Sequence, residues 1–197
     1  IKGNKISNPS VISIANQKGG VGKTTTAINL STALAAVNNK VLIMDLDAQG
    51  NASTGLGVPK DEREKSTYDL LTGKASLKDV VKKTNIPSLF IAPASTDLSS
   101  IDVDLFEEQG RVVKLRDLLA KESFDFDYIL IDCPPSLNLL TINSMVASNS
   151  VLVPLQAEFF ALEGLSQLLL TVRDIRSKIN QDLKIHGIVL TLSLIHI

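Results

Sequence analysis

The sequence predicts an α/β protein with a doubly wound, mostly parallel sheet and helices on both faces, and three observations support this. Short apolar runs alternate with longer stretches of helical spacing along most of the 197 residues. The runs are apolar throughout rather than alternating, as in strands that are covered on both faces. A glycine-rich loop follows the first run and carboxylates follow two others, at the strand ends where such sheets bind ligands. We therefore expect a ligand site at the carboxyl edge of the sheet.

The composition excludes several other classes of protein. Apolar residues make up 44% of the chain, charged residues 21%, and the formal net charge is −1, as in an ordinary globular protein. This charge favours neither DNA nor a membrane surface, although a local basic patch could still bind nucleic acid. The single cysteine, Cys133, excludes an intramolecular disulfide and suits a reducing cytoplasm. No stretch approaches the ~20 apolar residues of a membrane span, so we expect no stable membrane association.

The expected elements follow the chain in order. We expect strands at residues 11–15, 41–44, 89–92, 128–131, 151–153 and 185–190, and helices at 24–37, 77–83, 111–120, 139–147 and 162–179. Ser76 and Asp79 approximate a capping box for the second helix. The apolar face of the last helix, including Leu162, Leu165, Leu168, Leu169 and Val172, is expected to enter the core, as are Phe159 and Phe160 just before it. Residues 60–65 form a mixed charge run, interpreted as a solvated loop.

Both ends of the sequence are unusual. Residues 1–10 are polar and are expected to form a loose lead-in. Residues 192–197 match the translation expected, in one reading frame, of a transposase end sequence used in sequencing libraries. We therefore interpret them as a non-native tail, and expect residues 11–191 to be a P-loop domain whose C-terminal part is missing. Sequencing the source gene through the codon for Thr191 tests this hypothesis.

Residues 17–25 have the chemistry of a phosphate-binding loop. Glycine at positions 19, 20 and 22 allows successive backbone N–H groups to turn toward phosphate oxygens. The helix expected from about Lys23 adds the positive end of its dipole. Lys23 would bind the β- and γ-phosphates, and the Thr24 hydroxyl would bind the Mg²⁺ that bridges them. The alternative, a glycine-rich turn with two solvated lysines, is disfavoured by the strand before the loop and the helix after it.

Carboxylates follow two further strands. Asp132 ends an apolar run, as in a Walker B element, and a Mg²⁺ held by Thr24 needs such an anion nearby; the alternative is an aspartate that caps the next turn. Asp45 and Asp47, two residues apart, would point to opposite sides of an extended chain. A carboxylate at position 47 could order a water for in-line attack, or could satisfy backbone groups in the turn at Gly50.

The phosphate loop departs from the common pattern G-x-x-x-x-G-K-S/T, because Gln17 stands at the first glycine position and a second lysine, Lys18, follows it. This resembles the deviant Walker A motif, K-G-G-x-G-K-S/T, of the ParA/MinD superfamily of ATPases. Residues 45–51, 132–144 and 156–165 also resemble the corresponding segments of ParA/Soj proteins. The resemblance therefore covers nearly all of residues 11–191.

The resemblance implies a deviant Walker A P-loop ATPase that binds ATP and Mg²⁺. Nucleotide contacts are expected for Lys18, Gly19, Gly20, Val21, Gly22, Lys23, Thr24, Thr25 and Pro134. Pro134 and Pro135 stiffen the chain where a γ-phosphate-sensing switch would lie. Metal contacts are implied for Thr24, Asp45 and Asp132. Catalytic roles are implied for Lys18, which would reach the nucleotide of the other subunit, for Lys23, and for Asp47, which would orient the attacking water.

The implied function is a nucleotide-dependent switch for chromosome or plasmid partition. The complete protein would dimerise on binding ATP, bind non-specific DNA on the nucleoid in the cytoplasm, and hydrolyse ATP slowly until a ParB-type partner stimulates it. We expect this chain to bind DNA poorly if its C-terminal part is missing. Three alternatives stay open: a MinD-like division-site ATPase, which needs an amphipathic C-terminal helix; an iron–sulfur electron-transfer protein, which needs two cysteines per subunit; and an inactive fragment.

Overall fold

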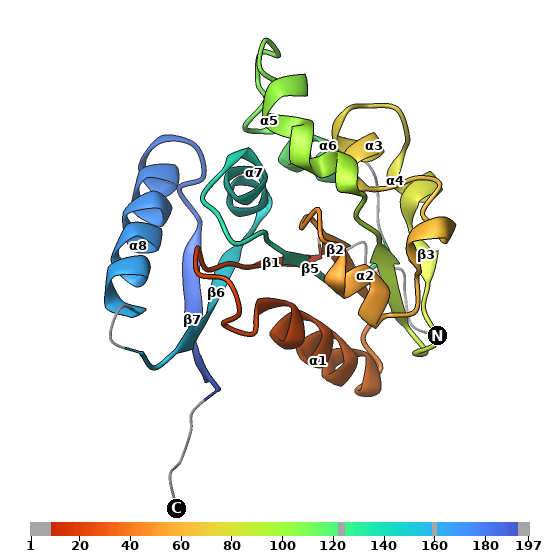
Figure 1. The fold of residues 1–197 in the computed structure, drawn as a ribbon, viewed down its shortest axis with the longest axis horizontal. Helices are drawn as coiled ribbons and strands as arrows, with labels where there is room; N and C mark the ends of the chain where they lie inside the picture. The colour runs from red at the N-terminus through yellow and green to blue at the C-terminus, as the bar shows by residue number, and fades with distance from the viewer. Residues whose placement is uncertain (1–8, 122–124, 159–160, 193–197) are drawn as a thin grey trace, which may run out of the picture.

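The computed structural model describes residues 9–121, 125–158 and 161–192, which form a seven-stranded sheet with helices on both faces (Figure 1). The strands lie in the order β3-β4-β2-β5-β1-β6-β7, and every pairing is parallel except that of β3 with β4. The strands are β1 (Ser10–Ile14), β2 (Val41–Asp45), β3 (Lys82–Lys83), β4 (Leu89–Ala92), β5 (Tyr128–Asp132), β6 (Ser150–Gln156) and β7 (Lys184–Thr191). The doubly wound, mostly parallel sheet predicted from the sequence is confirmed.

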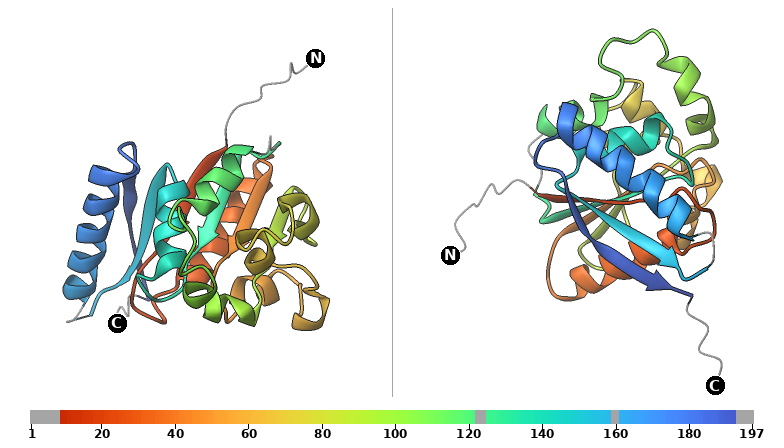
Figure 2. Two further views of the ribbon diagram at one scale, coloured as in Figure 1. Left: turned by 90° about the horizontal axis from the view of Figure 1, so that it is seen from above. Right: turned by 90° about the vertical axis from the view of Figure 1, so that its left-hand side faces the viewer.

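More helices pack on one face of the sheet than on the other (Figures 1 and 2). One face carries α1 (Lys23–Ala36) and α2 (Asn51–Gly55), which share a buried cluster with strand residues such as Ile43. The other face carries α3 (Thr67–Leu71), α6 (Lys114–Lys121), α7 (Leu139–Ala147) and α8 (Ala161–Lys178), which share a second cluster. The shorter elements are η1 (Lys60–Glu62), α4 (Leu77–Val80), η2 (Thr96–Ser100) and α5 (Ile101–Asp104).

The central strands explain why the site forms at one edge of the sheet. Every residue of β2 is buried, and in β5 only Tyr128 is not, because both faces are covered by helices. Each strand ends in one carboxylate, and the parallel register places Asp45 opposite Asp132. The apolar part of each strand contributes roughly 1.5–3 kcal/mol per fully buried large side chain. That packing holds the two carboxylates together at the carboxyl edge.

The segment after α4 differs from the prediction. A helix was expected over residues 77–83, but α4 ends at Val80 because Val81 is extended (φ −66°, ψ 127°). Lys82 and Lys83 then pair with β4 as a short antiparallel edge strand, and charged side chains are common on such edges. The predicted capping box is confirmed, since the Asp79 side chain accepts hydrogen bonds from the Ser76 N–H and hydroxyl.

The predicted apolar face of α8 is only partly correct. Leu168 and Val172 are buried and Leu165 packs against the same core, but Leu162 is 70% exposed and Leu169 is 38% exposed. The helix lies at the β7 end of the sheet (Figure 1), where only one stripe of it can meet the core. Phe159 and Phe160, residues 1–8 of the lead-in and residues 193–197 of the tail lie outside the described residues. Among the described helices, none has the length and apolar character to cross a membrane.

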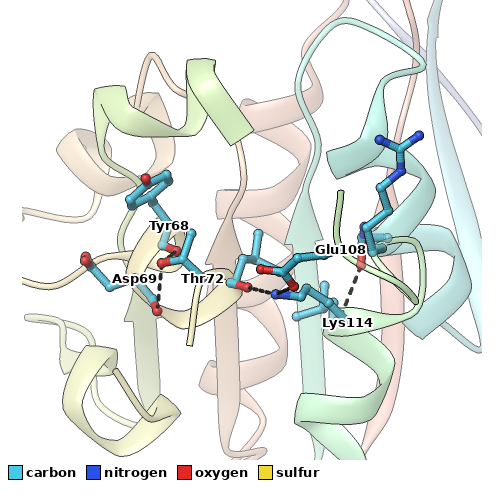
Figure 3. A network of polar contacts seen from close by, with 9 residues as sticks. Tyr68, Asp69, Thr72, Glu108 and Lys114 are labelled. Atoms are coloured by element: carbon cyan, nitrogen blue, oxygen red, sulfur yellow. Dashed lines mark hydrogen bonds and ion pairs between the residues drawn. The ribbon is translucent and has the colours of Figure 1, made fainter. Parts of the chain in front are cut away.

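A polar network ties α3 to the segment that leads into α6 (Figure 3). Lys114, in the first turn of α6, pairs with Glu108 and donates a hydrogen bond to the Leu71 carbonyl at 3.1 Å. At the other end of α3, the Thr67 hydroxyl donates to the Asp45 carbonyl at 2.7 Å. The helix therefore braces the carboxyl end of β2 from the outer layer of the protein.

Candidate functional site

A pocket of about 390 Å³ lies at the carboxyl edge of the sheet. It is lined by Gly19, Gly20, Gly22, Lys23, Thr24, Thr25, Asp47, Gln49, Asn51, Pro135 and Leu192. These residues come from the loop after β1, the start of α1, the loop after β2, the first residue of α2, the loop after β5 and the residue that follows β7. The structure therefore places the predicted phosphate loop and Asp47 around one cavity.

The phosphate loop depends on its glycines for backbone conformation. Gly20 has φ +75° and Gly22 has φ +81°, a region that costs other residues roughly 1–2 kcal/mol. A Cβ atom on Gly20 would meet no atom within 4 Å, so conformation rather than space requires glycine there. Gly22 is the N-cap of α1, and no side chain caps the helix. The first-turn N–H groups of α1 are therefore available to an anion in the pocket.

Lys23 lies at the centre of the site with its side chain largely buried. Its ammonium donates a hydrogen bond to the Lys18 carbonyl at 2.9 Å. Burial lowers the pKa of Lys23, while the carboxylates of Asp132 and Asp47 oppose that shift. A buried ammonium held by a neutral loop carbonyl can turn to a phosphate oxygen at little cost, because its attraction to an anionic acceptor is stronger than its attraction to a neutral one.

Asp132 is a buried carboxylate close to the Thr24 hydroxyl and the Lys23 ammonium. It is fully buried, and neither of its oxygens has a hydrogen-bond partner of ordinary geometry within the described part of the chain. Burial, with the nearby Asp45 carboxylate, raises the pKa of Asp132 to about 7, while the Thr24 hydroxyl and the Lys23 ammonium oppose this shift. Two free oxygens beside a threonine hydroxyl and a phosphate loop fit a hydrated cation such as Mg²⁺.

Asp45 and Asp47 lie in different surroundings, as their spacing predicts. Asp45 is fully buried, and its oxygens accept hydrogen bonds from the Asp47 N–H at 3.1 Å, the Ser53 N–H at 2.9 Å and the Ser53 hydroxyl at 2.7 Å. Burial raises the pKa of Asp45, and the Ser53 hydrogen bonds oppose it. Asp47 lines the pocket and accepts a hydrogen bond from the Gln49 N–H at 3.0 Å.

Three predicted nucleotide contacts have side chains that do not line the pocket. The Lys18 ammonium forms an ion pair with Glu158, in the loop between β6 and α8. The Val21 side chain is buried, and its carbonyl accepts a hydrogen bond from the Thr191 hydroxyl at 2.7 Å. Pro134 is buried, and it is the next residue, Pro135, that lines the pocket.

Cys133 is a buried residue of the core. Its thiol lies 2.9 Å from the Ser144 hydroxyl, and burial raises its pKa to about 12. A thiol with so high a pKa carries almost no thiolate at neutral pH, so it is a poor nucleophile and metal ligand. Within the described residues, no group of three or more histidine, cysteine or acidic side chains could hold a metal ion by itself.

Arg63 is the buried residue near the site that the sequence analysis missed. It belongs to the charge run at residues 60–65, and the other five residues of that run are exposed as predicted. Arg63 is only 9% exposed, and its guanidinium donates to backbone carbonyls around the loop that carries Asp47. A single charged residue within a charge run carries no periodic signal that could have revealed its burial.

Comparison with known proteins agrees with this geometry. The family model described as an AAA domain matches residues 9–185. The chromosome partitioning protein ParA of Caulobacter vibrioides is 52% identical over 184 residues, which cover 92% of this chain and 69% of that protein. The chromosome-partitioning ATPase Soj of Treponema pallidum is 51% identical over 177 residues, covering 90% of this chain and 69% of that protein.

Solved structures agree as well. The structure of cobyrinic acid a,c-diamide synthase from Mycobacterium smegmatis, with a bound ATP analogue and magnesium, matches with a TM-score of 0.91 and 38% identity, over 96% of this chain and 75% of that one. The named sequence relatives are partitioning proteins, which favours partition over the division-site alternative. From its phosphate loop, its sheet and these relatives, the chain belongs to the ParA/Soj family of partition ATPases.

Proposed function

We propose that this chain binds and hydrolyses MgATP in the pocket at the carboxyl edge of its sheet, as the switch step of a DNA partition system. The observation that carries the proposal is the convergence of Lys23, Thr24 and Asp47 on one pocket beside the unpartnered carboxylate of Asp132. The ATP analogue and magnesium bound to the M. smegmatis protein support the choice of ligand. Partition rather than another use of ATP rests on the named relatives.

Each residue has a role that follows from its position. The first-turn N–H groups of α1 and the Lys23 ammonium bind the phosphates. The Thr24 hydroxyl and the Asp132 carboxylate would hold the metal. When bound, Mg²⁺ neutralises charge on the β- and γ-phosphate oxygens. Asp47 orients the water for in-line attack, and no arginine among the pocket-lining residues is positioned to accelerate it, so hydrolysis is slow.

Asp45 has a supporting role in this proposal rather than the metal contact first expected. Its oxygens already accept three hydrogen bonds, from Ser53 and from the Asp47 N–H. Moving those oxygens onto a metal would leave buried donors unpaired, at roughly 1–3 kcal/mol each. Asp45 therefore holds the loop that carries Asp47.

Lys18 acts across a homodimer in this proposal. Its pairing with Glu158 is partly exposed, with side-chain exposures of 38% and 43%, and exposed pairs of this kind contribute only about 0–1 kcal/mol. Lys18 can therefore leave Glu158 and reach the nucleotide of a second subunit at little cost. Dimerisation, non-specific DNA binding on the nucleoid and a ParB-type stimulatory partner complete the proposed cycle, and they rest on family resemblance.

The experiment that tests the proposal compares two variants for MgATP binding and hydrolysis. Lys23→Ala is expected to abolish binding of a fluorescent ATP analogue, because it removes the buried ammonium of the phosphate loop. Asp47→Ala is expected to bind the analogue as the unchanged chain does and to lose phosphate release. Lys178→Ala, which removes an exposed ammonium from the last turn of α8, is the control.

Each outcome separates the hypotheses. Equal loss of binding in Lys23→Ala and Asp47→Ala would exclude the water-orienting role of Asp47. No binding by the unchanged chain would favour the inactive-fragment alternative. Binding that survives Lys23→Ala would refute the proposed site itself.

A further inference from the structure

Arg63 is a buried guanidinium whose recorded partners are neutral oxygens. Its Nε donates to the Val58 carbonyl at 3.0 Å, and Nη1 donates to the Ala94 carbonyl at 3.3 Å. Nη2 lies within hydrogen-bond distance of the Gly50 carbonyl at 3.2 Å, the Thr54 hydroxyl at 2.7 Å and the Val58 carbonyl at 2.8 Å. Among the described residues, no carboxylate lies within ion-pair distance of it.

Burying a guanidinium lowers the stability of the folded state unless its N–H groups donate hydrogen bonds to the protein. Removing a guanidinium from water carries a large desolvation cost, which hydrogen bonds offset only when their geometry is good. The fork of Arg63 reaches three separate parts of the chain, namely the start of α2, the loop after α2 and the loop after β4. A planar group with fixed donor directions holds such parts at set distances in a way that a flexible ammonium does not.

A second set of hydrogen bonds holds α2 through Ser53. The Ser53 hydroxyl donates to Asp45 at 2.7 Å and accepts from the Ala94 N–H at 3.0 Å. Ala94 therefore has its N–H bound to Ser53 and its carbonyl bound to Arg63. Through these contacts the end of β2, helix α2 and the loop after β4 are joined by hydrogen bonds.

Gly50 shows how closely the guanidinium approaches this loop. A Cβ atom built on Gly50 would lie 2.1 Å from Nη1 of Arg63, and the residue has φ +64°. The Gly50 N–H donates to the Asp47 carbonyl at 2.8 Å, which links Gly50 directly to Asp47. Asp47 thus lies in a four-residue loop between two anchored ends, Asp45 and Gly50.

We propose that Arg63 is a positioning residue for ATP hydrolysis, which sets the place of the Asp47 carboxylate in the pocket by anchoring Gly50 and the first turn of α2. This inference rests on the proposed function, because it assumes that Asp47 orients the attacking water. Arg63 does not line the pocket, so it acts through the loop and contacts no nucleotide. Its removal therefore affects the hydrolysis step more than nucleotide binding.

The test uses Arg63→Met in the full chain, because methionine keeps the apolar stem and loses all donors. We expect kcat for MgATP hydrolysis to fall by roughly 10- to 100-fold, the loss that a displacement of about 1 Å can cause. KM is expected to stay within about threefold, because the phosphate loop is untouched. Hydrogen exchange is expected to become faster at residues 47–54 and to stay unchanged at residues 18–25.

Asn180→Ala is the matched control for a general loss of stability. The Asn180 side-chain nitrogen also lies within hydrogen-bond distance of several backbone carbonyls, those of Met145, Val146 and Ser148, and it precedes β7 outside the residues that line the pocket. We expect it to lower the unfolding midpoint without changing kcat at temperatures where the chain is folded. Equal kcat in Arg63→Met and Asn180→Ala would overturn the proposal, as would faster exchange at residues 18–25 in Arg63→Met.

Gly50→Ala tests the same contact if Arg63→Met does not fold. Its Cβ must displace the guanidinium, so we expect the same selective fall in kcat and the same faster exchange at residues 47–54. In a chain that also carries Arg63→Lys, the two changes are expected to be less than additive, because both disturb one contact. Full additivity would overturn the proposal.

Failure of this inference can be distinguished from failure of the proposed function. If Lys23→Ala still binds nucleotide, the proposed site is wrong, yet the exchange experiment still reports whether Arg63 anchors residues 47–54. If Lys23→Ala abolishes binding and Arg63→Met leaves both kcat and loop exchange unchanged, only the role of Arg63 is refuted.

Discussion

Asp132→Asn is expected to change how the stability of the nucleotide-free protein depends on pH. Burial raises the pKa of Asp132 to about 7, from the ordinary aspartate value of 3.8. A raised pKa means that the folded state holds the proton more tightly than the unfolded state. The stability that this proton contributes is full below about pH 3.8 and is lost as the pH rises through about 7.

The size of the effect follows from the two pKa values. At about 1.4 kcal/mol per unit, the carboxylate should cost the folded state roughly 2–3 kcal/mol more at pH 8 than at pH 5. Asparagine does not titrate, so the part of the pH dependence of the free energy of unfolding that Asp132 causes should be absent from Asp132→Asn. Its amide is also buried without a partner, but that cost of roughly 1–3 kcal/mol is the same at every pH. The measured quantity is therefore the difference in slope between the two proteins.

The assay is urea unfolding between pH 5 and pH 8 without nucleotide or magnesium. Asp182→Asn, which removes an exposed carboxylate after α8, controls for the change in net charge. In a thermal unfolding experiment on a chain of this length, the same 2–3 kcal/mol would shift the midpoint by roughly 5–10 °C. Parallel pH profiles for Asp132→Asn and the unchanged protein would refute the idea that an unpartnered, ionisable carboxylate lies at this position.

Three further predictions concern the loop, the interface and the core. Gly22→Ala should lower the free energy of unfolding by roughly 1–2 kcal/mol because of φ +81°, whereas Gly19→Ala, with its Cβ 4.0 Å from the nearest atom, should cost little in the same urea titration. Lys18→Ala should change that free energy by less than about 1 kcal/mol yet weaken ATP-dependent dimerisation in light scattering; an unchanged dimer removes its proposed role. Leu168→Ala should cost about 2–5 kcal/mol, and Leu169→Ala far less, if α8 packs by the observed face.

The sheet and the phosphate loop could be predicted because their signals are local. Apolar runs of strand length and a glycine-rich loop before a helix depend on neighbouring residues alone. The spacing of Asp45 and Asp47 also carried correct information, since one is buried and the other lines the pocket. The missed strand β3 is two residues long and depends on its pairing with β4, which no local pattern encodes.

The role of Arg63 could not be predicted for a different reason. Its burial depends on the carbonyls of Gly50, Val58 and Ala94, which are brought together only by the folded chain. In the sequence it is one charge among six, and such runs are normally solvated. The choice between Pro134 and Pro135 at the pocket is similar, because it depends on the local direction of the loop after β5.

The buried charged side chains around the site differ in whether the protein itself supplies their hydrogen-bond partners. The Asp45 carboxylate accepts three hydrogen bonds, and the Arg63 guanidinium donates to carbonyls in three parts of the chain, so both side chains hold the Asp47 loop. Among the described residues, Asp132 has no hydrogen-bond partner of ordinary geometry, although leaving a buried carboxylate unpaired is costly. The free-energy cost of burying the Asp132 carboxylate is explained if a cationic ligand binds beside it and supplies the missing positive charge. The same comparison assigns positioning roles to Asp45 and Arg63 and ligand binding to Asp132, three residues that sequence charge alone does not distinguish.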